Sequence, residues 1–515
     1  MLKAVIAACA FMFATLLADP GQAQSTGSKV LSVAEVYEPQ TLDPTTSTAD
    51  LISVVTQGAF ETLYTYDQNW QTVPMLAAAM PETSADGKTV TIKLRSNVPF
   101  HDGTIMTADD VVASLLRWEK LSPRGKIAAA ATESISAKGA DTVEIKLKAP
   151  FSPLVSLLAY FNSAAAIMPK AKAEAAMDGP ITDTAQLIGT GPFRITERKP
   201  DQYVRLTKFD RYAALSTPPS LLAGKREALV DEVRFVPVPN ANTRLEGVLS
   251  GQYDVGDGLS AEFYERVKKS ATTVPLVTKP GSWILFVMNN KDGLTKNLKI
   301  RKAVQAALDS DSIMLAAFGS PDFFSLHSSL YPEGSPFFAK AGANLYNQKN
   351  TKLAKQLLQE AGYKGEPFRI LASQQYDFLY KAALVSKQNL EDAGFKVELV
   401  MMDWASVMSK RNTPEIWEAF LTFHGFVPEP SLYNIVNSAY AGWWDSPAKN
   451  EAMTKFNVTV DPKERAAVWE NVQALMMEEV PTVVLGEFYN LIAHSKAVKG
   501  MHGVPLVPFW NVSKN

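Results

Sequence analysis

Four side chains that can bind a metal or transfer protons lie close together in the segment VPFHDGTIMTADDVV, residues 98–112. They are His101, Asp102, Asp109 and Asp110. An imidazole beside carboxylates is typical of zinc sites and of general acid–base catalysis. Either kind of site needs further ligands or a nucleophile at a matching spacing, and the neighbouring sequence offers none.

The same segment also contains the signals of ordinary local structure. Val98 and Phe100 are expected to end a strand, and Asp102-Gly103 favours a turn. Thr107 and Asp110 have the spacing of a capping box before a helix that begins VVASLLRW, and acidic residues suit a helix N-terminus. We therefore predict that this segment is structural and that it is neither a catalytic nor a metal site.

Strands and helices alternate along the rest of the chain. Residues 31–39, 89–95, 142–148, 202–209 and 232–238 read as strands, several with apolar residues at every second position. Apolar stripes at helical spacing predict helices within 299–309, 353–363 and 462–481. This alternation predicts an α/β protein with mixed sheets, and 515 residues correspond to about three domains.

Composition and the N-terminus narrow the class of protein. Hydrophobic residues make up 46% and charged residues 20%, and a net charge of −2 gives no reason to expect nucleic-acid binding. Lys3, the apolar run 4–18 and the small residues Gly21 and Ala23 predict a signal peptide over 1–23, hence a periplasmic protein. The single cysteine, Cys9, lies within it, so we expect neither disulfides nor thiolate chemistry in the mature chain.

A colinear series of motifs resembles the extracellular solute-binding proteins of family 5, the oligopeptide, dipeptide and nickel receptors of ABC importers. The motifs are EPQTLDP (38–44), FETLYTYD (60–67), VPFHDGTIMTADDVV (98–112), GTGPF (189–193), LSGQYDV (249–255), IRKAVQAALDSDSI (300–313), AKQLLQEAGY (354–363), LEDAGFKVEL (390–399) and DPKERAAVW (461–469). The resemblance spans essentially the whole mature chain.

The resemblance implies a two-lobed periplasmic-binding-protein clamp with an extra small α/β domain. Lobe I would comprise 24–58, 187–283 and 488–515, the accessory domain 59–186, and lobe II 284–487, with hinge crossings near 283 and 487. The ligand would bind between the lobes, and the closed form, a monomer without cofactor, would dock on an inner-membrane ABC permease. A clamp of this kind needs no catalysis, because a ligand that contacts both lobes shifts the open–closed equilibrium.

Aromatic residues gather in 404–444 at about twice their overall fraction of 10%: Trp404, Trp417, Phe420, Phe423, Phe426, Tyr433, Tyr440, Trp443 and Trp444. Trp417 and Phe420 are expected to fill the core of lobe II. Trp404 follows a predicted strand where family members place a cleft tryptophan. Trp443-Trp444 lie in loop-like sequence, and Trp283 lies at a predicted crossing, so we predict that all four of these tryptophans line the cleft.

One departure from the family bears on the ligand. Peptide receptors often carry Gly-Trp-x-Ala-Asp-Tyr-x-(Asp/Glu)-Pro, in which the aspartate pairs with the α-amine of the peptide. Here the stretch reads TFHGFVPEP (422–430), with Phe426 at the aspartate and Phe423 at the tryptophan. Losing one partner of a buried charge pair costs about 3–5 kcal/mol, which disfavours peptides with a free amine.

Several polar residues remain as candidates for binding. Asp50, His424 or Glu429 would substitute for the aspartate, although Glu429 beside two prolines is expected to be structural. Arg411 is a candidate anchor for a ligand carboxylate, and the alternative is a solvated surface charge. His424 alone is a weak metal signal, because metal sites use three or four ligands, so no metal is predicted.

The sequence predicts a receptor for a short peptide or a similarly sized, polar, amino-acid-derived compound, such as an opine-like conjugate without a free α-amine. A sugar, a metal chelate, or a role in presenting ligand to a membrane sensor remain alternatives. An enzyme is disfavoured because the hydrolase, metalloprotease and P-loop motifs are absent from the sequence. GDGLSA (256–261) resembles a dinucleotide fingerprint only loosely and is expected to be a loop.

Overall fold

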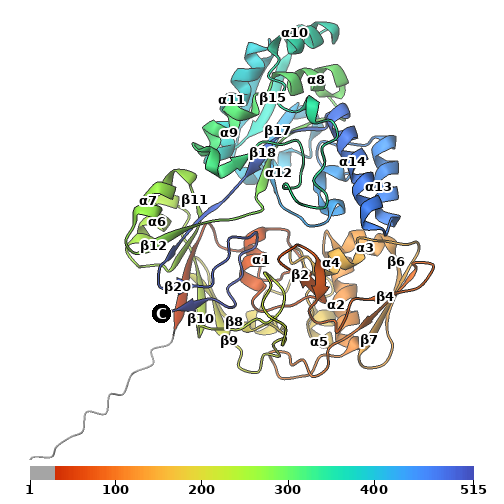
Figure 1. Ribbon diagram of the computed structural model, residues 1–515, viewed down its shortest axis with the longest axis vertical. Coiled ribbons are helices and arrows are strands. Elements are labelled where there is room, and N and C mark those ends of the chain that lie inside the picture. The colour runs from red at the N-terminus through yellow and green to blue at the C-terminus, as the bar shows by residue number, and fades with distance from the viewer. Residues whose placement is uncertain (1–28) are drawn as a thin grey trace, which may run out of the picture.

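The computed structural model of the chain describes residues 29–515, so the predicted signal peptide 1–23 lies outside the described residues. The described chain forms two lobes, each built on its own mixed sheet, and a smaller accessory unit. In Figure 1 the second lobe lies at the top, with the first lobe and the accessory unit beneath it. Among residues 29–515, no helix combines the length and the hydropathy needed to cross a bilayer.

The first lobe contains a seven-stranded sheet in the order β12-β19-β11-β1-β10-β9-β8. Its strands are β1 (Val30–Glu35), β8 (Phe193–Lys199), β9 (Tyr203–Lys208), β10 (Glu232–Pro237), β11 (Val255–Leu259), β12 (Thr273–Val277) and β19 (Leu491–Ser495). β1 pairs in parallel with β10 and β11, whereas β19 runs antiparallel to both of its neighbours. The lobe also holds α1 (Asp50–Thr56), α6 (Ala241–Leu249), α7 (Tyr264–Lys269) and the short pair β20 (Val498–Lys499) and β21 (Ser513–Lys514).

The second lobe contains a six-stranded sheet in the order β14-β18-β13-β17-β15-β16. These strands are β13 (Ser282–Met288), β14 (Phe324–Ser325), β15 (Pro367–Ala372), β16 (Lys396–Met401), β17 (Ala419–Gly425) and β18 (Thr482–Phe488). The helices of this lobe are α8 (Leu298–Ala307), α9 (Ser310–Phe318), α10 (Thr351–Glu360), α11 (Asp377–Asp392), α12 (Trp404–Lys410), α13 (Pro447–Val458) and α14 (Pro462–Glu479). Every residue of β13 and β18 is buried, because protein covers both faces of the sheet centre.

The accessory unit holds a four-stranded sheet in the order β4-β5-β7-β6 and the pair β2-β3. Its elements are β2 (Tyr64–Tyr66), β3 (Thr72–Pro74), β4 (Glu82–Thr83), β5 (Thr89–Lys93), α2 (Ala108–Leu121), α3 (Gly125–Ala131), β6 (Thr132–Ala137), β7 (Thr142–Leu147), α4 (Leu154–Ala159) and α5 (Lys170–Ala175). The predicted capping box is confirmed at the start of α2, where the Thr107 backbone N–H donates to Asp110 Oδ2 at 2.8 Å. The strand expected to end at Phe100 is reduced to a single bridge between Pro99 and Ile105.

The chain passes between the two large sheets twice, at 278–281 and at 489–490. These connections lie side by side, since the Thr278 N–H donates to the Asn490 carbonyl at 3.0 Å. Glu487 Oε1 also accepts a 2.8 Å hydrogen bond from the Gly281 N–H. The crossings therefore form a paired connection between the lobes, and a cavity opens beside it.

Candidate ligand-binding site

A cavity of about 960 Å³ lies between the two lobes. Both lobes and the accessory unit contribute to its wall, which includes the end of β1, the start of α1, the bulged strand β11, α12 and the end of β17. A volume of this size is at the upper end of the range for small-molecule pockets. The cavity is therefore large enough for a ligand of peptide size.

Five of the eight predicted binding residues line this cavity: Asp50, Trp404, Arg411, His424 and Phe426. They come from α1, α12 and the end of β17 with the residue after it. Trp404 forms part of an aromatic wall, with its ring 5.2 Å from that of Tyr376 and stacked at 6.0 Å on that of Phe423. The prediction that Trp404 faces the cleft thus agrees with its position.

The placement of Trp283 in the cleft wall is wrong. The chain crosses between the lobes at 278–281, so Trp283 is already the second residue of β13 and lies at the centre of the sheet. Its side chain is fully buried and its ring lies 6.5 Å from that of Tyr433. Trp283 is a core residue of the second lobe.

Trp443 and Trp444 also lie outside the cavity lining. Trp444 is buried, and its indole N–H donates to Glu479 Oε2 at 2.6 Å. Trp443 has a positive φ of 47° and stacks at 5.7 Å on Trp417, which is itself fully buried, as predicted. Trp444 points to helix α14 and Trp443 to the core tryptophan Trp417, because backbone conformation, which composition does not reveal, sets their direction.

Arg411, Tyr440 and His424 form a polar group on the second-lobe wall. Arg411 Nη1 donates to the Tyr440 hydroxyl at 3.2 Å, and His424 Nε2 lies 3.0 Å from the same hydroxyl. Arg411 Nε and His424 Nδ1 are buried without a hydrogen-bond partner, and no ion pair of the described residues includes Arg411. Burial, reinforced by the charges of Arg411 and Arg124, lowers the pKa of His424 to about 3, so this imidazole is neutral at physiological pH.

A second polar group joins α1 to the accessory unit. The Asn162 side-chain amide donates to Asp50 Oδ1 at 2.8 Å, and Arg124 Nη2 donates to Asn162 Oδ1 at 3.0 Å. Desolvation raises the pKa of Asp50, and the positive charge of Arg124 partly offsets this effect. Arg124 lines the cavity but was missed from the sequence, because SPRGK carries no signal that separates it from a surface segment.

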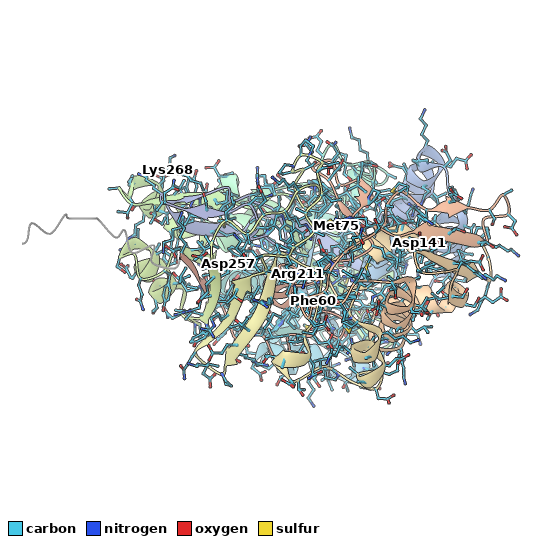
Figure 2. The ribbon with its side chains drawn as sticks, turned by 90° about the horizontal axis from the view of Figure 1, so that it is seen from below. Phe60, Met75, Asp141, Arg211, Asp257 and Lys268 are labelled. Carbon is cyan, nitrogen blue, oxygen red and sulfur yellow. The ribbon has the colours of Figure 1, made fainter. Side chains whose placement is uncertain are left out.

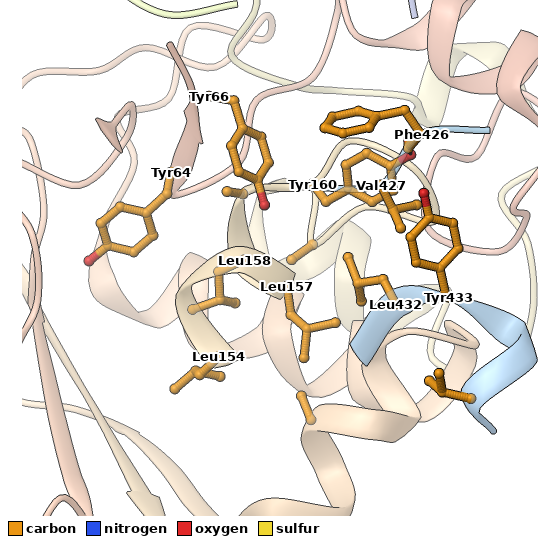
Figure 3. Packing of buried hydrophobic residues seen from close by; sticks show 14 of the residues in the cluster. Tyr64, Tyr66, Leu154, Leu157, Leu158, Tyr160, Phe426, Val427, Leu432 and Tyr433 are labelled. Carbon is orange, nitrogen blue, oxygen red and sulfur yellow. The ribbon is translucent and has the colours of Figure 1, made fainter. Parts of the chain in front are cut away.

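Phe426 occupies the wall where family peptide receptors carry the aspartate. Its side chain is 4% exposed and its ring lies 4.7 Å from that of Trp70 in the accessory unit. The Tyr160 hydroxyl donates to its carbonyl at 3.2 Å, and Figure 3 shows the two rings side by side within the apolar cluster. The nearest carboxylate on this part of the wall is Asp50, whose Oδ2 lies 3.6 Å from the point where a Cβ on the adjacent Gly425 would stand.

The histidine and acids of the opening motif do not reach the cavity, and their predicted structural role is confirmed. His101 accepts from the Gly189 N–H at 3.2 Å through Nδ1, and its Nε2 lies 3.0 Å from the Gly191 carbonyl. Glu429 is buried in an ion pair with Arg465 at 2.7 Å, which is also a structural role. Within the described ranges, no three His, Cys, Asp or Glu side chains come together as a metal site would require.

Comparisons with known proteins agree with this architecture. A probable peptide ABC transporter periplasmic-binding protein of Sinorhizobium fredii, y4tO, is 26% identical over 92% of this chain and 91% of its own. The glutathione-binding protein GsiB of Escherichia coli K12 is 24% identical over 90% of each chain.

Solved structures share the fold. AgaA from A. tumefaciens R10, solved in complex with agropinic acid, superposes with a TM-score of 0.78 at 26% identity and covers 95% of this chain and 99% of its own. A dipeptide-binding protein from Pseudoalteromonas sp. SM9913 in complex with Met-Leu gives a TM-score of 0.81 at 20% identity, covering 95% of this chain and all of its own. The predicted two-lobed α/β clamp is confirmed.

The match to a family profile is broad as well. The profile described as "Bacterial extracellular solute-binding proteins, family 5 Middle" matches residues 71–444. That range contains most of the accessory unit, most of both sheets and the candidate binding residues of the second lobe. This chain belongs to the bacterial extracellular solute-binding proteins of family 5.

Proposed function

We propose that this protein is the periplasmic receptor of an ABC importer for a peptide-sized, amino-acid-derived compound that carries a carboxylate and lacks a free α-amine, such as an opine-like conjugate. The observation that carries the proposal is Arg411, a guanidinium on the cavity wall with no acidic partner among the described residues. A guanidinium in such a site favours a carboxylate, with which it forms paired hydrogen bonds. Tyr440 and neutral His424 complete the group around it.

Phe426 supports the other part of the proposal, that the ligand lacks a free α-amine. An ammonium placed against the rings of Phe426 and Trp70 would lose water without gaining a carboxylate partner there. In an N-carboxyalkyl amino acid the α-nitrogen is flanked by two carboxylates of the same molecule, so its charge needs less from the protein. AgaA, bound to agropinic acid, is 26% identical to this chain, the same identity as y4tO.

A peptide with a free amine is the second candidate, and Asp50 favours it. Its carboxylate faces the cavity beside Gly425, one residue from Phe426, so that it would replace the missing aspartate from the opposite lobe. The raised pKa of Asp50 weakens this alternative, because the desolvated carboxyl holds its negative charge less readily.

The remaining parts of the proposal concern the export of the receptor, its oligomeric state, its partner and its division into units. The chain is exported by the signal peptide 1–23, works as a monomer without catalysis, cofactor or nucleic acid, and delivers its ligand to a permease. The proposed units are 24–58, 187–283 and 488–515 for lobe I, 59–186 for the accessory domain and 284–487 for lobe II. The strands of the three large sheets fall within these units, apart from Ser282 and Trp283 at the start of β13 and Phe488 at the end of β18.

The test compares two ligand scaffolds that carry the same neutral side chain. N2-(1-carboxyethyl)-L-citrulline has the alkylated nitrogen, and the dipeptide L-alanyl-L-citrulline has the free amine. Titration calorimetry should show the conjugate binding more tightly, whereas tighter binding of the dipeptide would contradict the proposed ligand class and favour the Asp50 alternative.

Arg411→Gln should weaken conjugate binding about 10- to 100-fold, because a hydrogen bond to a charged group contributes about 1.5–3 kcal/mol. The matched control is Arg266→Gln, which removes an exposed arginine of α7 that pairs with Glu246 outside the cavity. An unchanged affinity in Arg411→Gln would remove Arg411 as the carboxylate anchor.

A further inference from the structure

Two carboxyl groups lie side by side on the first-lobe wall of the cavity, away from Arg411. Glu35 is the last residue of β1 and Asp257 lies in β11, and both line the cavity. The two strands are parallel neighbours with Val33 opposite Val255 and Ala34 opposite Gly256, so Glu35 comes next to Asp257. Their side chains lie close enough for each carboxyl to shift the pKa of the other.

A break in β11 aims Asp257 at the cavity. The pairing of β11 with β19 shifts register between Gly256 and Leu259, and Gly258 has a φ of +59°. A bulge of this kind re-aims a side chain out of the ladder, and bulges are frequent next to functional sites. Residues 256–259, expected to be a loop, are thus a bulged strand that positions an acid.

The positive charge of Arg244 lowers the pKa of both carboxyls, but this arginine forms an ion pair with neither of them. Arg244 of α6 donates to four backbone carbonyls: those of Val238, Pro239, Asp257 and Gly258, at 2.7–2.9 Å. None of the ion pairs within 29–515 includes Glu35 or Asp257. Glu35 is only 2% exposed, and its Oε1 is buried without a hydrogen-bond partner.

The pair therefore has no ion-pair partner in the described part of the chain. Burial and the neighbouring Asp257 raise the pKa of Glu35 well above its usual range, and the positive charge of Arg244 offsets this only in part. Two carboxyls are too few for a metal site, and no third ligand joins them in the described part of the chain. A ligand cation, by contrast, would meet Asp257 and the exposed ring of Tyr37, which lines the cavity two residues after Glu35.

We propose that Glu35 and Asp257 form a subsite for a cationic group of the ligand, an ammonium or a guanidinium at the end of its side chain. The inference rests on the proposed function and adds the orientation of the ligand. Its carboxylate binds at Arg411, and its cationic group binds at the first-lobe wall. Asp257 lies on the side of the molecule that carries Lys268 of α7, far from Asp141 of the accessory unit (Figure 2). Because the two subsites belong to different lobes, a ligand with both charges bridges them and favours the closed clamp.

The test varies the side chain and keeps each scaffold fixed. N2-(1-carboxyethyl)-L-arginine is compared with its citrulline analogue, and L-alanyl-L-arginine with L-alanyl-L-citrulline, because guanidinium and urea have nearly the same shape and differ in charge. On the scaffold that binds, the arginine member should bind at least tenfold more tightly. Equal binding of the two members would overturn the inference and leave the proposed function standing.

Variants of Glu35 and Asp257 test whether these two residues cause the preference for the arginine compounds. Asp257→Asn, and the double variant Glu35→Gln with Asp257→Asn, should reduce the preference for arginine to less than threefold. Glu246→Gln, which removes an exposed acid of α6, should retain it. Melting temperatures confirm that the variants fold, and a tenfold preference that survives in a folded double variant would overturn the inference.

The remaining outcomes separate the two proposals. Binding of the dipeptides alone, with arginine preferred, would support the cation subsite and contradict the proposed conjugate. Binding of none of the four compounds would overturn both.

Discussion

At the residue scale, two histidines are kept neutral by burial in different settings. His101 joins the turn before α2 to the backbone of residues 189–191, and burial lowers its pKa to about 4. His424 faces the cavity, and its pKa falls to about 3. Both imidazoles are therefore uncharged at physiological pH.

His101 makes the stability of the fold depend on pH. In the unfolded chain a histidine binds a proton near pH 6.5, whereas in the folded chain His101 binds one only near pH 4. Between these values the unfolded state holds more protons, so the free energy of unfolding falls as pH falls, by up to about 1.4 kcal/mol per pH unit. Urea unfolding of the wild type and of His101→Gln from pH 7 to pH 4.5 should give curves that diverge below about pH 6.5, and parallel curves would contradict the assignment.

At the scale of elements, local signals in the sequence were sufficient for most of the helices and strands that were predicted from it. The capping box of α2, the glycine after α10 at φ +74° and the end of α14 before Pro481 all follow from residue type alone. The direction in which aromatic side chains point could not be predicted from residue type. Trp283 is buried because its strand is central in a sheet whose neighbours come from residues about 140 and 200 positions away, and no local pattern carries that pairing.

The binding residues were predictable only in part for the same reason. Trp404, Arg411 and His424 were found because they lie near a family motif or carry a distinctive side chain. Strand pairing and contacts between the units bring distant segments together, and this places Glu35, Asp257 and Arg124 on the cavity wall. Their types and local spacing are those of ordinary surface residues.

The GTGPF segment gives a prediction about close approach between elements. A Cβ on Gly191 would lie 2.4 Å from the Gly58 carbonyl oxygen, and the Gly191 N–H already donates to the Ala59 carbonyl at 3.0 Å. Gly191→Ala should lower the free energy of unfolding by more than about 2 kcal/mol, because backbone must move to accept the methyl group. Gly179→Ala is the control, since nothing lies within 4 Å of its Cβ, and equal stability of the two variants in urea would refute this reading.

At the scale of the whole molecule, the accessory unit is attached to the second lobe by contacts that include two residues of the cavity wall, Tyr160 and Phe426. The Ser152 N–H donates to the Asn457 carbonyl at 2.8 Å, and the Tyr160 hydroxyl donates to the Phe426 carbonyl. One apolar cluster runs through both units and includes Tyr160 and Phe426. If the clamp opens by separation of the second lobe from the accessory unit, these contacts would be broken, as predicted for a ligand-driven clamp.

Tyr160→Phe should therefore shift the clamp toward the open form. Loss of one hydrogen bond of about 1 kcal/mol corresponds to about a fivefold increase in the dissociation constant. Tyr66→Phe removes a comparable bond, to the Ser156 carbonyl at 3.1 Å, that stays within the accessory unit, and it should leave affinity unchanged. Titration calorimetry measures the dissociation constants of both variants, and X-ray scattering reports the mean lobe separation. Equal effects of the two variants would contradict a role of the Tyr160 hydroxyl in closure.

The position of β19 in the first sheet bears on how the chain is made. This strand, residues 491–495, lies between β11 and β12, and β12 pairs with no other strand. The sheet that starts with β1 near the N-terminus therefore stays incomplete until the ribosome has added almost the last residue, and pairing across such a span forms slowly. The edge strand β12 thus gains its place in the first sheet only after the segment that forms β19 has been made.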